Sequence, residues 1–166
     1  MSICPGCGLD LPDDDTASYD GYYHTSPECW SLYSQVMTDE YENDTLYEQC
    51  HQLTVDAYAV QHAGGEHPDA SVGLHLTGLH LVLEAGVEPG NVPQHYQTLS
   101  EVVDPWPGFA PPRMPDDLPT IRDVAEAETP TEHATRSREW AGSLWEAWSP
   151  YHDVVASLVT MHLTAS

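Results

Sequence analysis

The sequence predicts an all-α protein, a bundle of four or five main helices with a small cysteine-bearing module at its N-terminus. Helix start signals recur between residues 26 and 150, where a Ser or Thr cap precedes Pro or an acidic residue. No segment shows the apolar–polar alternation of a half-buried strand. The 166 residues are enough to bury a substantial core.

Each expected helix follows from a local start or stop signal. The helices run from Ser26-Pro27 to about Met37, from the Thr45/Glu48 capping box to about His62, from His67-Pro68-Asp69 to about Glu84, from Thr120/Asp123 over a short stretch, from Thr129-Pro130 to about Trp148, and from Ser149-Pro150 to about Leu163. Residues 1–25 are predicted to be a loop-built module, and the proline-rich residues 104–119 an irregular crossover. We expect residues 1–30 and the bundle of residues 26–166 to pack as one domain.

The charge is strongly asymmetric. Four arginines and no lysine stand against 27 acidic residues, which gives a net charge of −23. Such a field opposes unaided binding to nucleic acids or to anionic membranes. An acidic mimic of a nucleic acid is one interpretation. Adaptation to a cytoplasm with molar potassium chloride is the favoured one, because a screening length of about 3 Å removes most of the repulsion.

The N-terminal residues and the hydropathy favour a cytoplasmic protein. The start of the chain has neither the basic nor the apolar segment of a signal peptide. The longest apolar stretches also fall well short of the ~20 residues that span a membrane.

Three cysteines define a candidate zinc knuckle. Cys4-Pro-Gly-Cys7 has the spacing that brings two thiolates onto one tetrahedral metal ion, and Cys29 offers a third sulfur at a helix start. His24 is the expected fourth ligand, with Asp20 or a water molecule as alternatives. Three sulfurs and one imidazole favour structural zinc. A redox pair is the competing interpretation, but it normally requires a strand-to-helix junction.

Several histidines lie on apolar helix faces, which suggests a second site inside the bundle. This set comprises His51, His62, His75 and His133, with Asp56 as a ligand or an orienting group. Histidines on facing helices can bind a metal in a bundle core, although a lone imidazole is more often a hydrogen-bonded core residue. We expect His62, His75 and His133 to converge, with His51 deeper in the same groove.

Several motifs resemble those of one family of small prokaryotic proteins, described only as a domain of unknown function. They are the C-P-x-C-G opening, the S-P-x-C-W segment, Gly73-Leu-His75-Leu, His133 with Arg138-Glu-Trp140, and above all the H-x-L-T-V-D-A-Y-x-x-Q-H segment of residues 51–62. The resemblance implies a haloarchaeal member with Cys4, Cys7, Cys29, His51, Asp56, His62 and His75 as signature positions. This sequence departs from the family pattern at residues 20–24, because the family's knuckle histidine lies nearer the position of Asp20.

Two functions follow from these patterns. The first is a zinc-binding protein whose zinc is structural and whose bundle is an interaction or regulatory module for an unknown protein partner. The second rests on a similarity of architecture to DinB-like bundles, which hold a metal on three histidines and include hydrolases and thiol transferases. In that case the histidine set would bind a second, catalytic metal ion.

Overall fold

The computed structural model describes residues 1–163 and is almost entirely helical. Its elements are β1 (Ser2–Ile3), β2 (Asp10–Leu11), α1 (Pro27–Tyr41), α2 (Asp44–Gln61), α3 (Asp69–Leu83), the 3-10 helix η1 (Pro89–Asn91), α4 (Val92–Val102), α5 (Ile121–Ala125), α6 (Pro130–Ala147), the 3-10 helix η2 (Ser149–Tyr151) and α7 (His152–His162). The predicted all-α class is confirmed, and four of the helices have fifteen or more residues.

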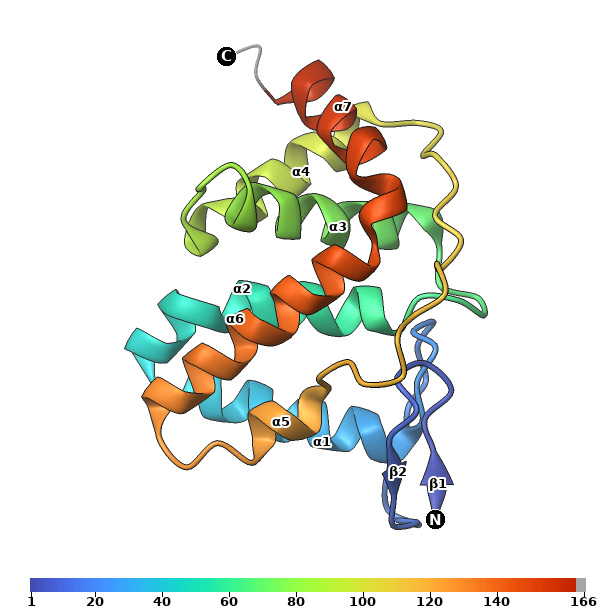
Figure 1. Ribbon diagram of the computed structural model, residues 1–166, viewed down its shortest axis with the longest axis vertical. Helices are drawn as coiled ribbons and strands as arrows, with labels where there is room; N and C mark the ends of the chain where they lie inside the picture. The colour runs from blue at the N-terminus through green and yellow to red at the C-terminus, as the bar shows by residue number, and fades with distance from the viewer. Residues whose placement is uncertain (164–166) are drawn as a thin grey trace.

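Helix α2 is the centre of the bundle. It packs mainly against α6 and α3, and α1 covers a further side (Figure 1). Its residues Leu53, Ala57 and Val60 are fully buried, as are Trp140 and Leu144 of α6. The crossover between α4 and α5 runs along one side of the molecule (Figure 1).

Most helix boundaries follow the local signals. Ser26 caps α1 by accepting a hydrogen bond from the Cys29 amide, and Thr120 with Asp123 forms the expected capping box of α5. Three start sites differ from the prediction. The last helix, α7, begins at His152 rather than at Ser149-Pro150, because Ser149–Tyr151 form the 3-10 helix η2. The cap of α2 is Asn43 rather than Thr45, and α4, which begins just before Pro93, was not predicted. An asparagine followed two residues later by proline was the available signal for α4.

The N-terminal module contains a short hairpin that the sequence did not reveal. Strands β1 and β2 pair in antiparallel fashion, with Ser2 opposite Leu11 and Ile3 opposite Asp10. Two-residue strands are too short for alternation to be detected. Within residues 1–163, no helix combines the length and the apolarity that crossing a membrane requires.

Candidate metal centre

Three sulfurs and one imidazole meet where the N-terminal module touches the bundle. The donor atoms of Cys4, Cys7, Cys29 and His62 all lie within 4.8 Å of one another. The Sγ atoms of Cys7 and Cys29 are 3.8 Å apart, and Cys29 Sγ lies 3.6 Å from His62 Nε2. Zn–S bonds of about 2.3 Å and Zn–N bonds of about 2.0–2.1 Å in a tetrahedron give edges of about 3.8 and 3.6 Å. The spacing therefore fits one tetrahedral ion.

The His62 ring is held in the tautomer that a metal ion needs. Its Nδ1 lies 2.7 Å from the carbonyl oxygen of Tyr58, to which it donates a hydrogen bond. This contact leaves the Nε2 lone pair directed at the sulfurs. The ring of Tyr58 stacks on the His62 ring at 3.9 Å, and its hydroxyl donates to Cys29 Sγ at 3.4 Å. Tyr58 thus orients one ligand and supports the negative charge of another.

Local turns bring the knuckle loop against α2. The Cys4 amide donates a hydrogen bond to the Leu9 carbonyl, and the Gly8 amide donates one to the Cys4 carbonyl. Gly8 adopts a positive φ of +78° in this turn. A side chain at Gly6 would place its Cβ 2.6 Å from His62 Cδ2. Only glycine therefore lets the loop approach the imidazole this closely.

The close approach of the sulfurs shifts the pKa values of two of these cysteines in opposite directions. Hydrogen bonds from Cys29 and Cys7 lower the pKa of Cys4, whereas hydrogen bonds and charge from Cys29 and Cys4 raise the pKa of Cys7. Burial opposes the charged form of His62, but the neighbouring Cys29 and Cys4 outweigh it and raise the His62 pKa to about 9. This is the electrostatic environment of a site that attracts a cation.

The structure corrects the fourth position of the knuckle. His62 takes the place expected for His24, and the exposed Asp20 also lies outside the group of donor atoms. The backbone amide of His24 donates to the His62 carbonyl at 2.8 Å, while the His24 ring lies against the turn at Gly65. His24 therefore aligns the loop with the end of α2, and its ring is directed elsewhere.

The predicted second set of histidines is divided among three places. His62 belongs to the cysteine cluster. His75 Nδ1 lies 2.8 Å from Asp56 Oδ1, and Asp56 also accepts hydrogen bonds from Tyr96 and Gln52. Burial raises the pKa of Asp56, against the effect of His75.

His51 and His133 meet on a residue that the sequence did not single out. Glu40 at the end of α1 is fully buried and lies between the two rings, with Oε1 3.0 Å from His51 Nδ1 and Oε2 2.8 Å from His133 Nε2. Burial would raise the pKa of Glu40, but hydrogen bonds from His133, His51 and Thr54 outweigh it and lower that pKa. Within residues 1–163, no cluster of donor atoms combines His62, His75 and His133.

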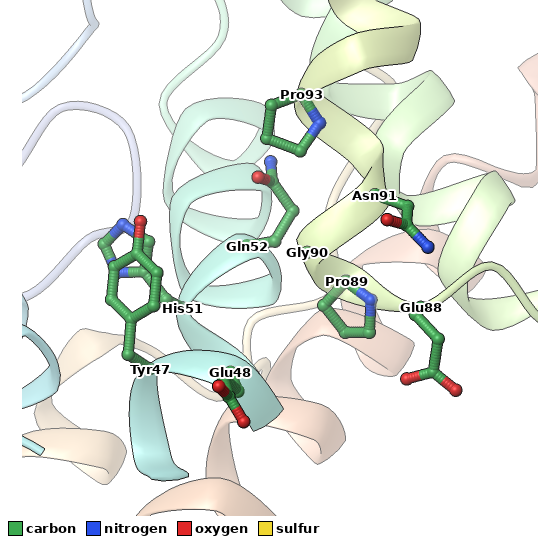
Figure 2. A pocket seen from close by; sticks show the side chains of 9 residues that line it. All are labelled: Tyr47, Glu48, His51, Gln52, Glu88, Pro89, Gly90, Asn91 and Pro93. Carbon is green, nitrogen blue, oxygen red and sulfur yellow. The ribbon is translucent and has the colours of Figure 1, made fainter. Parts of the chain in front are cut away.

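A hollow beside His51 is open to the surface and carries acidic groups. His51 and Tyr47 line one side of a cavity of about 380 Å³, and Glu48 and Glu88 lie at its edge (Figure 2). The Tyr47 ring stacks on His51 at 4.3 Å. The Nδ1 of His51 is engaged by Glu40, so this carboxylate determines how the imidazole is oriented beside the cavity.

Together these features define the class: a helical-bundle protein with a geometrically plausible Cys3His metal-binding site at the junction of its N-terminal module and its central helix. The chain belongs to the family of unknown function DUF5946, whose model matches residues 2–149. The match includes all four residues of the cysteine cluster and ends just after α6. No curated protein and no solved structure matches the chain.

Proposed function

We propose that this chain is a zinc-binding protein in which zinc is structural and the helical bundle is an interaction or regulatory module. One observation supports the proposal: three sulfurs and an imidazole nitrogen lie within 4.8 Å of one another, and the separations of 3.8 Å for Cys7–Cys29 and 3.6 Å for Cys29–His62 are those expected for a zinc tetrahedron. Four protein ligands leave no open coordination position for a substrate, as is usual in structural sites.

The position of the ligands explains what the zinc ion would stabilise. Cys4 and Cys7 lie in the knuckle loop, Cys29 in the first turn of α1, and His62 at the end of α2. One ion would therefore join three segments that are 22 and 33 residues apart along the chain. Because the N-terminal module has few apolar residues, metal binding would supply much of its folding free energy.

The surroundings of such a protein are part of the proposal. A thiolate site requires reduced cysteines, and all four cysteines are free in the structure. A reducing cytoplasm provides that condition. The net charge of −23 without lysine supports a cytoplasm of high salt, where the acidic surface stays hydrated and repulsion is screened.

The placement of the histidines favours the structural role over a DinB-like enzyme. Such an enzyme would require several of them around one metal ion with an open position. Here His62 faces the cysteines, His75 faces Asp56, and His133 faces Glu40.

Two matched histidine variants test the proposal. His62→Ala should lose the zinc that the wild type retains after a chelator challenge, and residues 1–30 should then become sensitive to protease. His24→Ala is the control and should keep its zinc. Zinc is measured by elemental analysis of protein purified at high salt, with Cys7→Ser as a second ligand variant. Full zinc content in both His62→Ala and Cys7→Ser would refute the proposal.

A further inference from the structure

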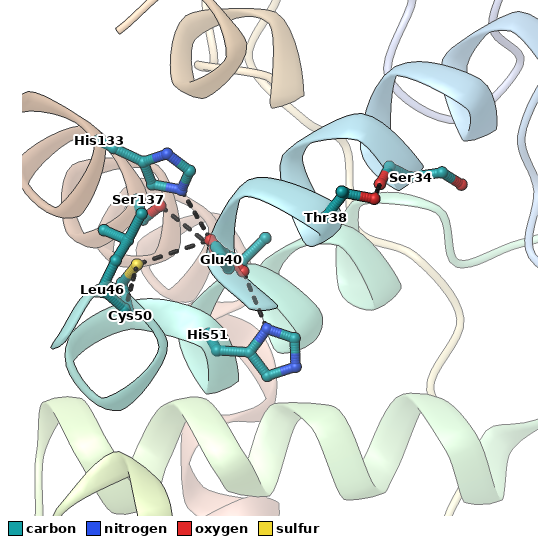
Figure 3. Close-up of polar contacts among 9 residues, drawn as sticks. Ser34, Thr38, Glu40, Leu46, Cys50, His51, His133 and Ser137 are labelled. Carbon is teal, nitrogen blue, oxygen red and sulfur yellow. Dashed lines mark hydrogen bonds and ion pairs between the residues drawn. The ribbon is translucent and has the colours of Figure 1, made fainter. Parts of the chain in front are cut away.

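A second group of donor atoms lies around Glu40, away from the cysteine knuckle. Glu40 comes from α1, Cys50 from α2 and His133 from α6, and all three side chains are buried. Their donor atoms lie within 4.8 Å of one another. Figure 3 shows the Cys50 sulfur and the His133 ring directed at the same carboxylate.

The contacts inside this group centre on one oxygen. Glu40 Oε2 lies 2.8 Å from His133 Nε2 and 3.5 Å from Cys50 Sγ, and it accepts a 2.6 Å hydrogen bond from the Thr54 hydroxyl. The other oxygen, Oε1, is held by His51 at 3.0 Å. A carboxylate fixed by an imidazole on one oxygen and presenting the other to nitrogen and sulfur is oriented as metal ligands commonly are.

Charge balance favours a divalent cation at this point. Metal binding would release the thiol proton that Cys50 directs at Glu40, and it would require the His133 proton to move from Nε2 to Nδ1. The carboxylate and the resulting thiolate then carry a charge of −2, and the neutral imidazole adds none. Buried charges are tolerated when they are paired or coordinate a metal, so a divalent ion would leave the group neutral. The donor set of oxygen, nitrogen and sulfur suits zinc or a similar transition metal, whereas Mg²⁺ and Ca²⁺ prefer oxygen ligands.

We propose that Glu40, Cys50 and His133 form a second metal site, for Zn²⁺ or a transition-metal ion of similar preference, independent of the cysteine knuckle. The 3.5 Å between Cys50 and Glu40 matches the tetrahedral edge of about 3.6 Å. His133 and Glu40 would have to separate by roughly 0.6 Å to reach an edge of about 3.4 Å. Such an adjustment lies within the reach of side-chain rotation.

A surface cavity reaches one of the three proposed ligands, His133. A cavity of about 310 Å³ is lined by His133 and Leu46, next to the buried group. The acidic residues Asp39, Glu42 and Glu128 lie around the same cavity. They would raise the local concentration of cations at its mouth.

Metal content of full-length variants tests the second site. Wild type saturated with Zn²⁺ and desalted should hold two ions per chain, and Cys50→Ser and His62→Ala should each hold one. Wild type with one ion, or Cys50→Ser with two, would overturn the proposal. Because His62→Ala tests the knuckle and Cys50→Ser the site at Glu40, the failure of either proposal is recognised separately.

Cobalt substitution provides a readout that does not depend on Cys50→Ser being folded. In the Cys4→Ser/Cys7→Ser/Cys29→Ser variant, Cys50 is the one cysteine left in the chain, so bound Co²⁺ should show the thiolate-to-metal charge-transfer absorption of a single cysteine ligand. His133→Ala in the same background should lose that absorption. Absence of thiolate absorption from Co²⁺ in this triple variant, or its persistence unchanged after His133→Ala, would show that the group at Glu40 is a hydrogen-bonded core cluster without metal.

Discussion

Replacing Gly78 by alanine tests how tightly α3 packs on the buried Asp56. A Cβ at Gly78 would collide with the Tyr96 hydroxyl and with Asp56 Oδ2. The Asp56 side chain has little room to move, because it is fully buried and hydrogen-bonded to His75 at 2.8 Å and to Gln52 at 3.0 Å. The substitution must therefore displace α3 or break part of this hydrogen-bond network.

The expected cost can be worked out from three contributions. Overpacking costs about 1–3 kcal/mol, and the loss of one hydrogen bond to a buried carboxylate adds about 1.5–3 kcal/mol. Alanine regains about 1 kcal/mol over glycine in a helix interior. Gly78→Ala should therefore lower the free energy of unfolding by about 1.5–5 kcal/mol.

Gly142 in α6 provides the matched control. A Cβ at this position would meet no atom within 4 Å, so only the helix propensity changes. Gly142→Ala should raise the free energy of unfolding by up to about 1 kcal/mol. Denaturant unfolding at one fixed potassium chloride concentration measures both variants, with equal m-values required for the comparison. If Gly78→Ala were as stable as Gly142→Ala, the close approach of α3 to Asp56 would be refuted.

Two further predictions concern solution conditions. Thermal stability should rise steadily from low salt towards molar potassium chloride, because 27 acidic residues repel one another over a Debye length of about 30 Å at 0.01 M salt. A melting temperature that does not depend on salt would instead favour the interpretation as a nucleic-acid mimic. Burial lowers the pKa of His67 to about 4, and the ring donates from Nδ1 to the His62 carbonyl while Nε2 accepts from Ser71. The folded state thus favours neutral His67, so its stabilising contribution is complete above the unfolded pKa of about 6.5 and is lost as the pH falls through about 4. Unfolding measured between pH 7 and 4 should show a smaller loss in His67→Gln than in the wild type, and equal losses would contradict this assignment.

The helical architecture could be predicted because its signals are local. A serine or threonine cap followed by proline marks a helix start within four residues, as at Ser26 and Thr129. The cysteine knuckle was recognisable for the same reason, since Cys4 and Cys7 are close in the sequence. The end of α1 was missed by four residues, because no local stop signal follows Met37.

The fourth ligand and the buried carboxylate depend on tertiary contacts. His62 lies 33 residues from Cys29, and only the path of α2 brings them together. His24 was favoured as the fourth ligand because it is close to Cys29 in the sequence. The glycine at position 6 leaves room for the His62 ring, but in the sequence it indicated only a tight turn. Glu40 resembles a surface residue because charged residues are seldom buried unless paired. Its partner His133 is 93 residues away.

Helix α2 connects these observations, because its polar side chains form three clusters and each cluster contacts a different part of the structure. Near its start, Cys50 and His51 face Glu40 of α1; at its middle, Asp56 binds His75 of α3; at its end, His62 meets the cysteines. An unpaired charge or hydrogen-bonding group inside a bundle costs more than an exposed one, so any other register of α2 would leave these groups without partners. The density of polar residues in the segment of residues 51–62 therefore has a structural reason: on a helix buried on several sides, they determine which elements pack where. Both proposed metal sites take a ligand from this helix or its C-terminal cap, Cys50 in one and His62 in the other, so a bound ion would stabilise the same arrangement.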